Sequence, residues 1–195
     1  MEGPERVYGD LEMPLSRKGV AQLESVGEAL AREPIAAVYA SPLERARIGA
    51  RAIARHHGLE PRIDPDLREI ARGRWAGLTW EEVEAGWPGG PAGFLADPAG
   101  YRAHDGETLA DVDRRAMAAL GRILREHAGT TVAIVSHSWI VRCILARAIG
   151  GAIERALNLP VECGAIATLN GGSSGWTVAS VNRRGAVRAE SERYG

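Results

Sequence analysis

Two short apolar segments, each followed by a helical pattern, constrain the fold of this chain more than any other feature. Residues Ile35–Ala40 and Thr131–Val135 are almost entirely apolar, and the second is rich in β-branched side chains. Strands of a parallel sheet are buried on both faces, so they carry apolar residues without alternation. Strands that alternate with helices predict a layered α/β domain. We therefore expect an α/β fold with a largely parallel sheet, in which Thr131–Val135 is a central strand.

The segments between these strands carry helix signals. Ser16 is placed to cap a helix over 16–32. The sequence Ser-Pro-Leu-Glu predicts a helix over 41–57, with Ser41 as its N-cap and the glutamate closing a capping box. An amphipathic pattern predicts a third helix over 107–127, and 138–149 predicts a fourth.

The remaining segments complete one expected domain over residues 1–195. A second capping box at 79–82 predicts a short helix. Residues 86–106 are rich in Gly, Pro and Trp, which favours a long irregular insertion over one end of the domain. Two late strands are expected at about 163–169 and 176–182, on either side of a turn.

Composition excludes several classes of partner. The 195 residues include 24 basic and 25 acidic side chains, a net charge of -1, which exerts no general attraction on nucleic acid or membrane. No apolar run approaches the ~20 residues that a membrane span needs. The two cysteines, Cys143 and Cys163, fit no zinc or redox spacing and are expected to be buried. We expect a cytoplasmic protein without metal or cofactor, whose oligomeric state stays open.

Three polar residues follow predicted strands and are candidates for chemistry. Arg45 and His137 lie where a strand gives way to a helix, and in open α/β sheets ligands bind outside the carboxyl ends of the strands. The helix after His137 also offers free N–H groups to an anion. A histidine that only caps a helix, and an arginine that only meets solvent, stay open as alternatives.

Glu69 is the third candidate. A carboxylate at a strand end can donate a proton when its surroundings raise its pKa. The alternative is an ion pair with Arg68 or Arg72.

The segment Gly171–Gly175 satisfies the G-x-S-x-G pattern of serine hydrolases. That motif requires a strand, a strained turn and then a helix, whereas here a second strand follows. We therefore expect a hairpin connection at this point and no esterase site.

Five segments, in order, resemble the motifs of the histidine phosphatase (phosphoglycerate-mutase-like) superfamily. They are RVYGDLEMPLSRKG (Arg6–Gly19), SPLERAR (Ser41–Arg47), LREIARGRWAGLT (Leu67–Thr79), GETLADVDRR and VSHSWIVRCIL. The resemblance extends from Arg6 to about Asn182 and is closest in character to α-ribazole phosphatases. It implies a three-layer α/β/α sandwich.

The resemblance also implies a function and roles for residues. The function is hydrolysis of a small phosphomonoester through a phosphohistidine, without metal. Arg45, His137 and Ser138 would bind the phosphoryl group, and Glu69 would protonate the leaving oxygen. Phosphotransfer of the phosphoglycerate-mutase type and non-catalytic binding of a phospholigand are the alternatives. Trp139 stands where the family has glycine, and it is expected to narrow the pocket.

The resemblance fails at the start of the chain. Family members open with a central apolar strand that ends in Arg-His-Gly and carries the nucleophilic histidine, and this sequence shows neither. We therefore expect a gap beside Thr131–Val135, or another segment that fills it, and no turnover by these 195 residues. One hypothesis is that Met1 is a false start and the natural protein begins upstream; the other is a degenerate, ligand-binding protein.

Overall fold

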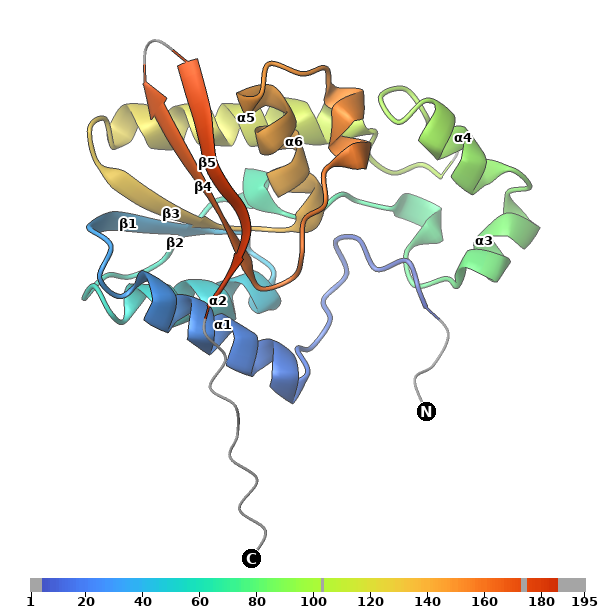
Figure 1. Ribbon diagram of the computed structural model, residues 1–195. Coiled ribbons are helices and arrows are strands. Elements are labelled where there is room, and N and C mark those ends of the chain that lie inside the picture. Colours follow the sequence, from blue (N-terminus) through green and yellow to red (C-terminus); the bar gives the residue numbers. More distant parts are fainter. Residues whose placement is uncertain (1–4, 103, 173–174, 186–195) are drawn as a thin grey trace, which may run out of the picture.

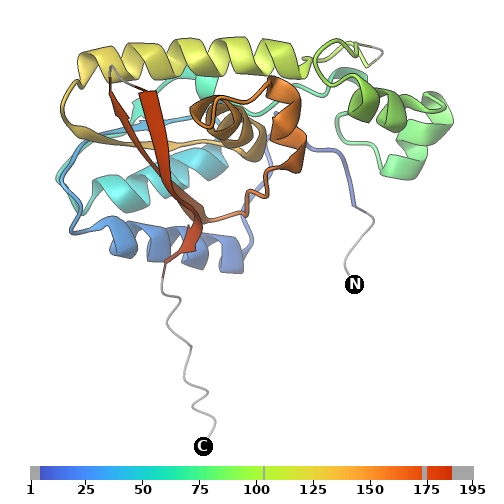
Figure 2. The same ribbon diagram turned by 45° about the horizontal axis from the view of Figure 1, so that its top comes forward.

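The computed structural model describes residues 5–102, 104–172 and 175–185. Its main sheet has three parallel strands in the order β2-β1-β3. Two helices cover one face of this sheet and two cover the other (Figures 1 and 2). The strands are β1 (Ile35–Ala40), β2 (Arg62–Ile63) and β3 (Thr131–Val135). The helices are α1 (Arg17–Leu30) and α2 (Glu44–Ala54) on one face, and α5 (Leu109–Glu126) and α6 (Ser138–Ala148) on the other.

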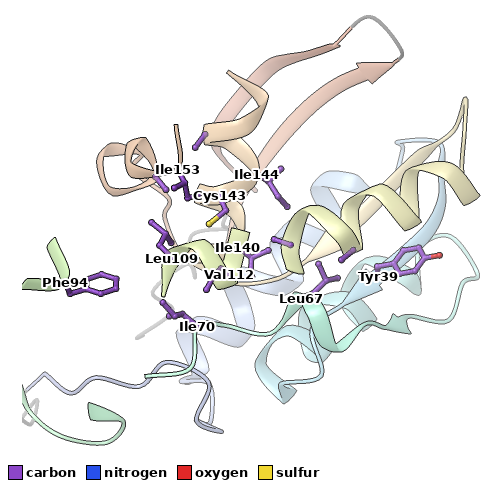
Figure 3. Close-up of a cluster of buried hydrophobic side chains, with 14 of the residues drawn as sticks. Tyr39, Leu67, Ile70, Phe94, Leu109, Val112, Ile140, Cys143, Ile144 and Ile153 are labelled. Atoms are coloured by element: carbon purple, nitrogen blue, oxygen red, sulfur yellow. The ribbon is translucent and has the colours of Figure 1, made fainter. Parts of the chain in front are cut away.

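Side chains of β1 and β3 alternate between two apolar cores, as the pleat of a strand requires. In β3, Val132 and Ile134 pack with α5 and α6, whereas Ala133 and Val135 pack with α1 and α2. Figure 3 shows the first core around Leu67, Leu109 and Ile140. Apolar contact on both faces, with β1 mostly buried and β3 partly buried, explains why the two strand sequences are largely apolar. The parallel pairing confirms the predicted α/β fold with a parallel sheet.

The position of β3 differs from the expected central one. Among the described residues β3 pairs with β1 alone, so it forms an edge of the sheet. Beyond that edge lies a cavity of about 840 Å³, which both β3 and β4 line. The expected gap beside Thr131–Val135 is therefore present. The strand β4 (Ala165–Gly172) does not fill it, because β4 pairs with β5 (Gly175–Arg184) in a separate antiparallel hairpin.

The hairpin also shows how the segment with the G-x-S-x-G pattern is placed, between two strands. The described residues on both sides of the connection belong to strands, so the strand-turn-helix geometry of a serine hydrolase is absent from them. Ser173 lies outside the described residues.

The start of α2 corrects one prediction. Ser16 caps α1 as expected, accepting the N–H of Gly19 at 3.1 Å. Ser41, however, is not the N-cap of α2, which is Leu43. The N–H of Ser41 instead donates to the carbonyl of Val135 at 3.0 Å and extends the β1–β3 ladder by one residue. This bond keeps Ser41 extended, and the helix begins three residues later, at Glu44.

The 86–106 insertion is more ordered than predicted. It contains the helix α4 (Gly90–Ala96), and it follows α3 (Trp80–Gly86), which has the predicted Thr79–Glu82 capping box. Phe94 of α4 is buried and contacts the ring of Trp139 edge-on, with centroids 5.9 Å apart. The insertion is thus packed against the end of the domain that carries α6. The 3-10 turns are η1 (Pro65–Leu67), η2 (Gly73–Trp75) and η3 (Ile153–Asn158).

Two smaller observations complete the fold. Cys143 is buried as predicted, but Cys163 is exposed, which corrects the prediction for that residue. No helix in the described part of the chain is long and apolar enough to cross a membrane.

Gly27 is the position where α1 approaches α2 most closely, and it supplies a stability prediction. A Cβ at Gly27 would lie 2.2 Å from the carbonyl oxygen of Ala52, a backbone atom that cannot turn away. We expect Gly27→Ala to lower the free energy of unfolding by about 1–3 kcal/mol. Gly121→Ala in α5 is the control: its Cβ would meet only the end of Arg125 at 3.3 Å, and helix propensity should raise stability by up to about 1 kcal/mol. Urea titrations in which the two variants shift alike would contradict this packing.

Candidate active site

The four site residues predicted from sequence line one cavity. Arg45 lies in the first turn of α2, Glu69 between η1 and η2, and His137 and Ser138 at the start of α6. Arg45, His137 and Ser138 all follow the carboxyl ends of β1 and β3, which are adjacent and parallel. This is the same cavity that borders the free edge of β3.

The pairing of β1 with β3 positions His137. Ala40 and Val135 are register partners, so the residues that follow them leave the sheet side by side. Ser41 and His137 meet there, with Oγ and Nε2 2.7 Å apart. The buried hydroxyl of Ser41 thus fixes the orientation of the imidazole ring.

The surroundings of His137 favour its neutral form. Only 9 % of the residue is exposed. Burial lowers the pKa of His137 to about 3, and the positive charges of Arg45 and Arg115 add to this effect. The imidazole is therefore neutral near pH 7.

Glu69 is also buried, and its carboxylate is held from two sides. Its Oε1 accepts the N–H of Ile70 at 2.9 Å, and its Oε2 accepts the hydroxyl of Ser138 at 3.2 Å. Burial raises the pKa of Glu69 despite these hydrogen bonds and the charge of Arg72. A carboxyl group with a raised pKa is suited to general-acid chemistry.

The alternative role for Glu69, an ion pair with a neighbouring arginine, is not what the structure shows. Arg68 pairs with Glu107, at 3.3 Å between Nη2 and Oε1. Among the described residues no ion pair joins Glu69 to Arg72.

Arg45 is half-buried and holds the N-terminal loop against α2. Its guanidinium donates to the carbonyls of Gly9 at 2.8 Å and Leu11 at 2.6 Å. The carboxylate of Glu12 accepts the N–H of Glu44 at 3.2 Å, at the positive end of the α2 dipole. Glu12 therefore provides an anion at the end of α2 where Arg45 provides a cation.

A network around Arg115 holds the segment that carries Glu69. Arg115 donates to the carbonyls of Arg68 at 2.6 Å and Glu69 at 3.1 Å, and its Nε lies 2.8 Å from Glu107. Glu107 in turn accepts the N–H of Ala71 at 2.9 Å. Burial would raise the pKa of Glu107, but these bonds and the nearby arginine charges lower it. Glu107 and Arg115 belong to the segment GETLADVDRR, and the sequence alone indicates no role for them.

Arg72 also lines the cavity, although the sequence suggests for it only an ion pair with Glu69. Its guanidinium carbon lies 4.6 Å from the centroid of Phe94 and 5.4 Å from that of Trp139. Burial lowers the pKa of Arg72 to about 10, partly offset by the charge of Glu69. No sequence signal distinguishes it from the exposed arginines nearby, since its burial depends on Phe94.

The arrangement suits an oxyanion with one group to protonate. Arg45, Glu69, His137 and the N-terminus of α6 line this one cavity, so it combines groups of the kind that hold an oxyanion with a carboxyl group of the kind that can donate a proton. In the described part of the chain there is no group of three or more His, Cys, Asp or Glu that could hold a metal ion.

The low pKa of His137 predicts a pH dependence of stability. The unfolded chain takes up a proton near pH 6.5, whereas the folded chain takes it up only near pH 3. Stability from this residue is therefore complete above pH 6.5 and is lost as the pH falls toward 3. We expect His137→Gln to lose less stability than the wild type between pH 7 and pH 4 in urea titrations. The exposed His56→Gln is the control; equal pH slopes for the wild type and both variants would contradict the prediction.

Comparisons with known proteins identify the family of the chain. The chain is 31 % identical over 145 residues to phosphoserine phosphatase 1 of Hydrogenobacter thermophilus, covering 74 % of this chain and 69 % of that protein. It is 30 % identical over 163 residues to the glucosyl-3-phosphoglycerate phosphatase of Mycolicibacterium vanbaalenii, covering 80 % and 71 %. The structure of an α-ribazole phosphatase from Shigella flexneri superposes with a TM-score of 0.83 at 22 % identity, covering 91 % and 88 %, and so shares the fold. The family model of the histidine phosphatase superfamily (branch 1) matches residues 2–184, and the chain belongs to that superfamily.

Proposed function

We propose that the protein acts on a small phosphomonoester, with Arg45, His137 and Ser138 binding the phosphoryl group and Glu69 protonating the leaving oxygen. The observation that supports this most is the raised pKa of the buried Glu69. This residue accepts a hydrogen bond from Ser138 and lines the same cavity as Arg45 and His137. The relatives named above are phosphatases of phosphoserine and of glucosyl-3-phosphoglycerate, which are small phosphorylated metabolites.

The phosphoryl group would be held by electrostatics. A dianion beside His137 offsets the repulsion from Arg45 that now disfavours the charged imidazole. Donors fixed in place before the reaction stabilise the charge that develops on the phosphoryl oxygens, and they need no reorganisation. The N–H groups of α6 add a fixed positive end on the same side.

Glu69 would act on the leaving group. A buried carboxylic acid beside a phosphoryl dianion keeps its proton until the leaving oxygen develops charge and takes it. The same group can then accept a proton from the water that hydrolyses the intermediate. Both proton transfers are thus assigned to Glu69, and the nucleophile that would form the intermediate is a separate question.

The covalent step defines the second candidate function. The family resemblance implies a histidine that attacks phosphorus, but His137 is the one histidine among the described residues that line the cavity, and its ring is bound to Ser41. Without a second histidine the site can bind a phosphoryl group but cannot form a phosphohistidine. Non-catalytic binding of a phospholigand is therefore the alternative to hydrolysis. A mutase would differ from a phosphatase by transferring the phosphoryl group instead of releasing phosphate. It would differ from a binding protein by converting its ligand.

A comparison of binding and turnover separates these functions. We expect vanadate and phosphate to raise the melting temperature of the 195-residue chain without turnover of p-nitrophenyl phosphate. Turnover should appear when the chain is extended ahead of Met1 by an apolar strand ending in Arg-His-Gly-Glu. The matched control ends in Arg-Ala-Gly-Glu. Binding without turnover in either version would favour the phospholigand-binding protein, and no binding at all would contradict both functions.

The extended chain that carries Arg-His-Gly-Glu should also lose turnover when residues of the site are substituted. We expect Arg45→Ala or His137→Ala to lower turnover by about 100- to 1000-fold, the usual effect of losing one fixed donor. Glu69→Gln should slow esters with poor leaving groups more than p-nitrophenyl phosphate, whose leaving group needs little protonation. Phosphate release from phenyl and p-nitrophenyl esters measures the difference. Equal losses on both esters would remove Glu69 from the acid role.

A further inference from the structure

Trp139 brings a large side chain to the end of the cavity that carries Glu69. It is the second residue of α6, and it lines the cavity. Its backbone N–H donates to the carboxylate of Glu69, which the hydroxyl of the preceding Ser138 also contacts. The indole ring in turn lies near Arg72, which belongs to the same segment as Glu69. The side chain of Trp139 therefore occupies space next to Glu69.

The indole ring is held by side chains from three parts of the chain. The guanidinium carbon of Arg72 lies over it at 5.4 Å, and that of Arg142 lies over it at 5.1 Å. Phe94 of α4 meets the ring edge-on, with centroids 5.9 Å apart. Contacts between aromatic rings, and between a cation and a ring, stabilise a particular ring position. Moving the indole aside would give up all three contacts, so Trp139 is a fixed wall of the cavity.

Phe94 supports this wall from behind. It is 4 % exposed and packs edge-on against Tyr101, with centroids 6.4 Å apart. Phe94 contacts Trp139 but does not itself line the cavity, so it stands on the far side of the indole. The buried phenyl ring thus fills the space into which the indole would otherwise turn.

We propose that Trp139 determines specificity by limiting the alcohol part of the substrate to narrow groups, linear or flat, and by excluding branched alcohols and saturated rings. This inference rests on the proposed function, in which Glu69 protonates the leaving oxygen. The alcohol part then lies next to Glu69 and therefore next to Trp139. A thick group would have to displace the indole from its contacts, and closely packed side chains give way only at a cost. Phe94 is a positioning residue that acts through Trp139.

Affinities for a narrow and a thick phosphate ester test the inference without turnover. The probes are methyl phosphate and inositol 1-phosphate, each titrated by calorimetry into the 195-residue chain. The part of the cavity along the free edge of β3 is lined mainly by apolar residues, so the hydroxyls of inositol disfavour binding there. We expect the wild type to bind methyl phosphate at least about 10-fold more tightly than inositol 1-phosphate. Trp139→Ala should bring this ratio to about one, because it removes the obstructing ring.

Three further variants separate the wall from general effects on the fold. Trp139→Leu keeps an apolar side chain for packing and should give an intermediate ratio, which tests the inference even if Trp139→Ala does not fold. Phe94→Leu leaves the indole in place without its edge-on support, so its ratio should also be intermediate. Trp87→Ala is the matched control and should keep the wild-type ratio. Trp87 is also half-buried, packs against the same core and contacts an arginine, Arg74, at 5.2 Å, but it does not line the cavity.

The ratio of the two affinities is the readout because it cancels any general weakening of the phosphate site. Equal affinities in the wild type, or a wild-type ratio that survives both substitutions of Trp139, would overturn the inference. A Trp139→Leu variant that binds inositol 1-phosphate more weakly, relative to methyl phosphate, than the wild type does would show that the indole attracts the alcohol part, and this would also overturn it. Failure of methyl phosphate and of inorganic phosphate to bind the wild type would instead refute the proposed function itself.

Discussion

The parallel pairing of β1 with β3 is the interaction on which the site depends. It sets Ala40 opposite Val135, and the bond from Ser41 N–H to the Val135 carbonyl carries the ladder one residue further. Arg45 and His137 are far apart in the sequence, but both therefore lie at the carboxyl end of the parallel strands. A shift of one residue in this register would exchange Val132 and Ile134 with Ala133 and Val135 between the two cores, and the difference in side-chain size opposes that exchange.

A second constraint holds the proton-donating side of the cavity. Glu69 lies in an extended segment with no strand partner, where the backbone needs other hydrogen-bond partners. Arg115 of α5 supplies them by donating to the carbonyls of Arg68 and Glu69, and Glu107 holds both Arg115 and Ala71. These bonds attach the segment to α5, a long helix that packs on the sheet. Glu69 therefore has a fixed position although it lies in a loop.

The cavity collects ionisable groups that burial pushes toward their neutral forms. The pKa of Glu69 is raised, and the pKa values of His137 and Arg72 are lowered to about 3 and about 10. Each group is held by the fold despite an unfavourable environment for its charge, and such shifts cluster at functional sites.

The sequence by itself determined the local structure and the order of the elements. The apolar runs β1 and β3, the Ser16 and Thr79 caps and the late hairpin all follow from short-range patterns, and the family motifs identified Arg45, Glu69 and His137. Only the tertiary structure decided what these residues contact. Ser41 resembles a helix cap in sequence, but a strand ninety residues later holds it extended. Arg72 resembles a surface arginine until Phe94 and Trp139 enclose it. Contacts between distant segments leave no periodic signal in a single chain, because they depend on how whole elements pack and not on the spacing of neighbouring residues.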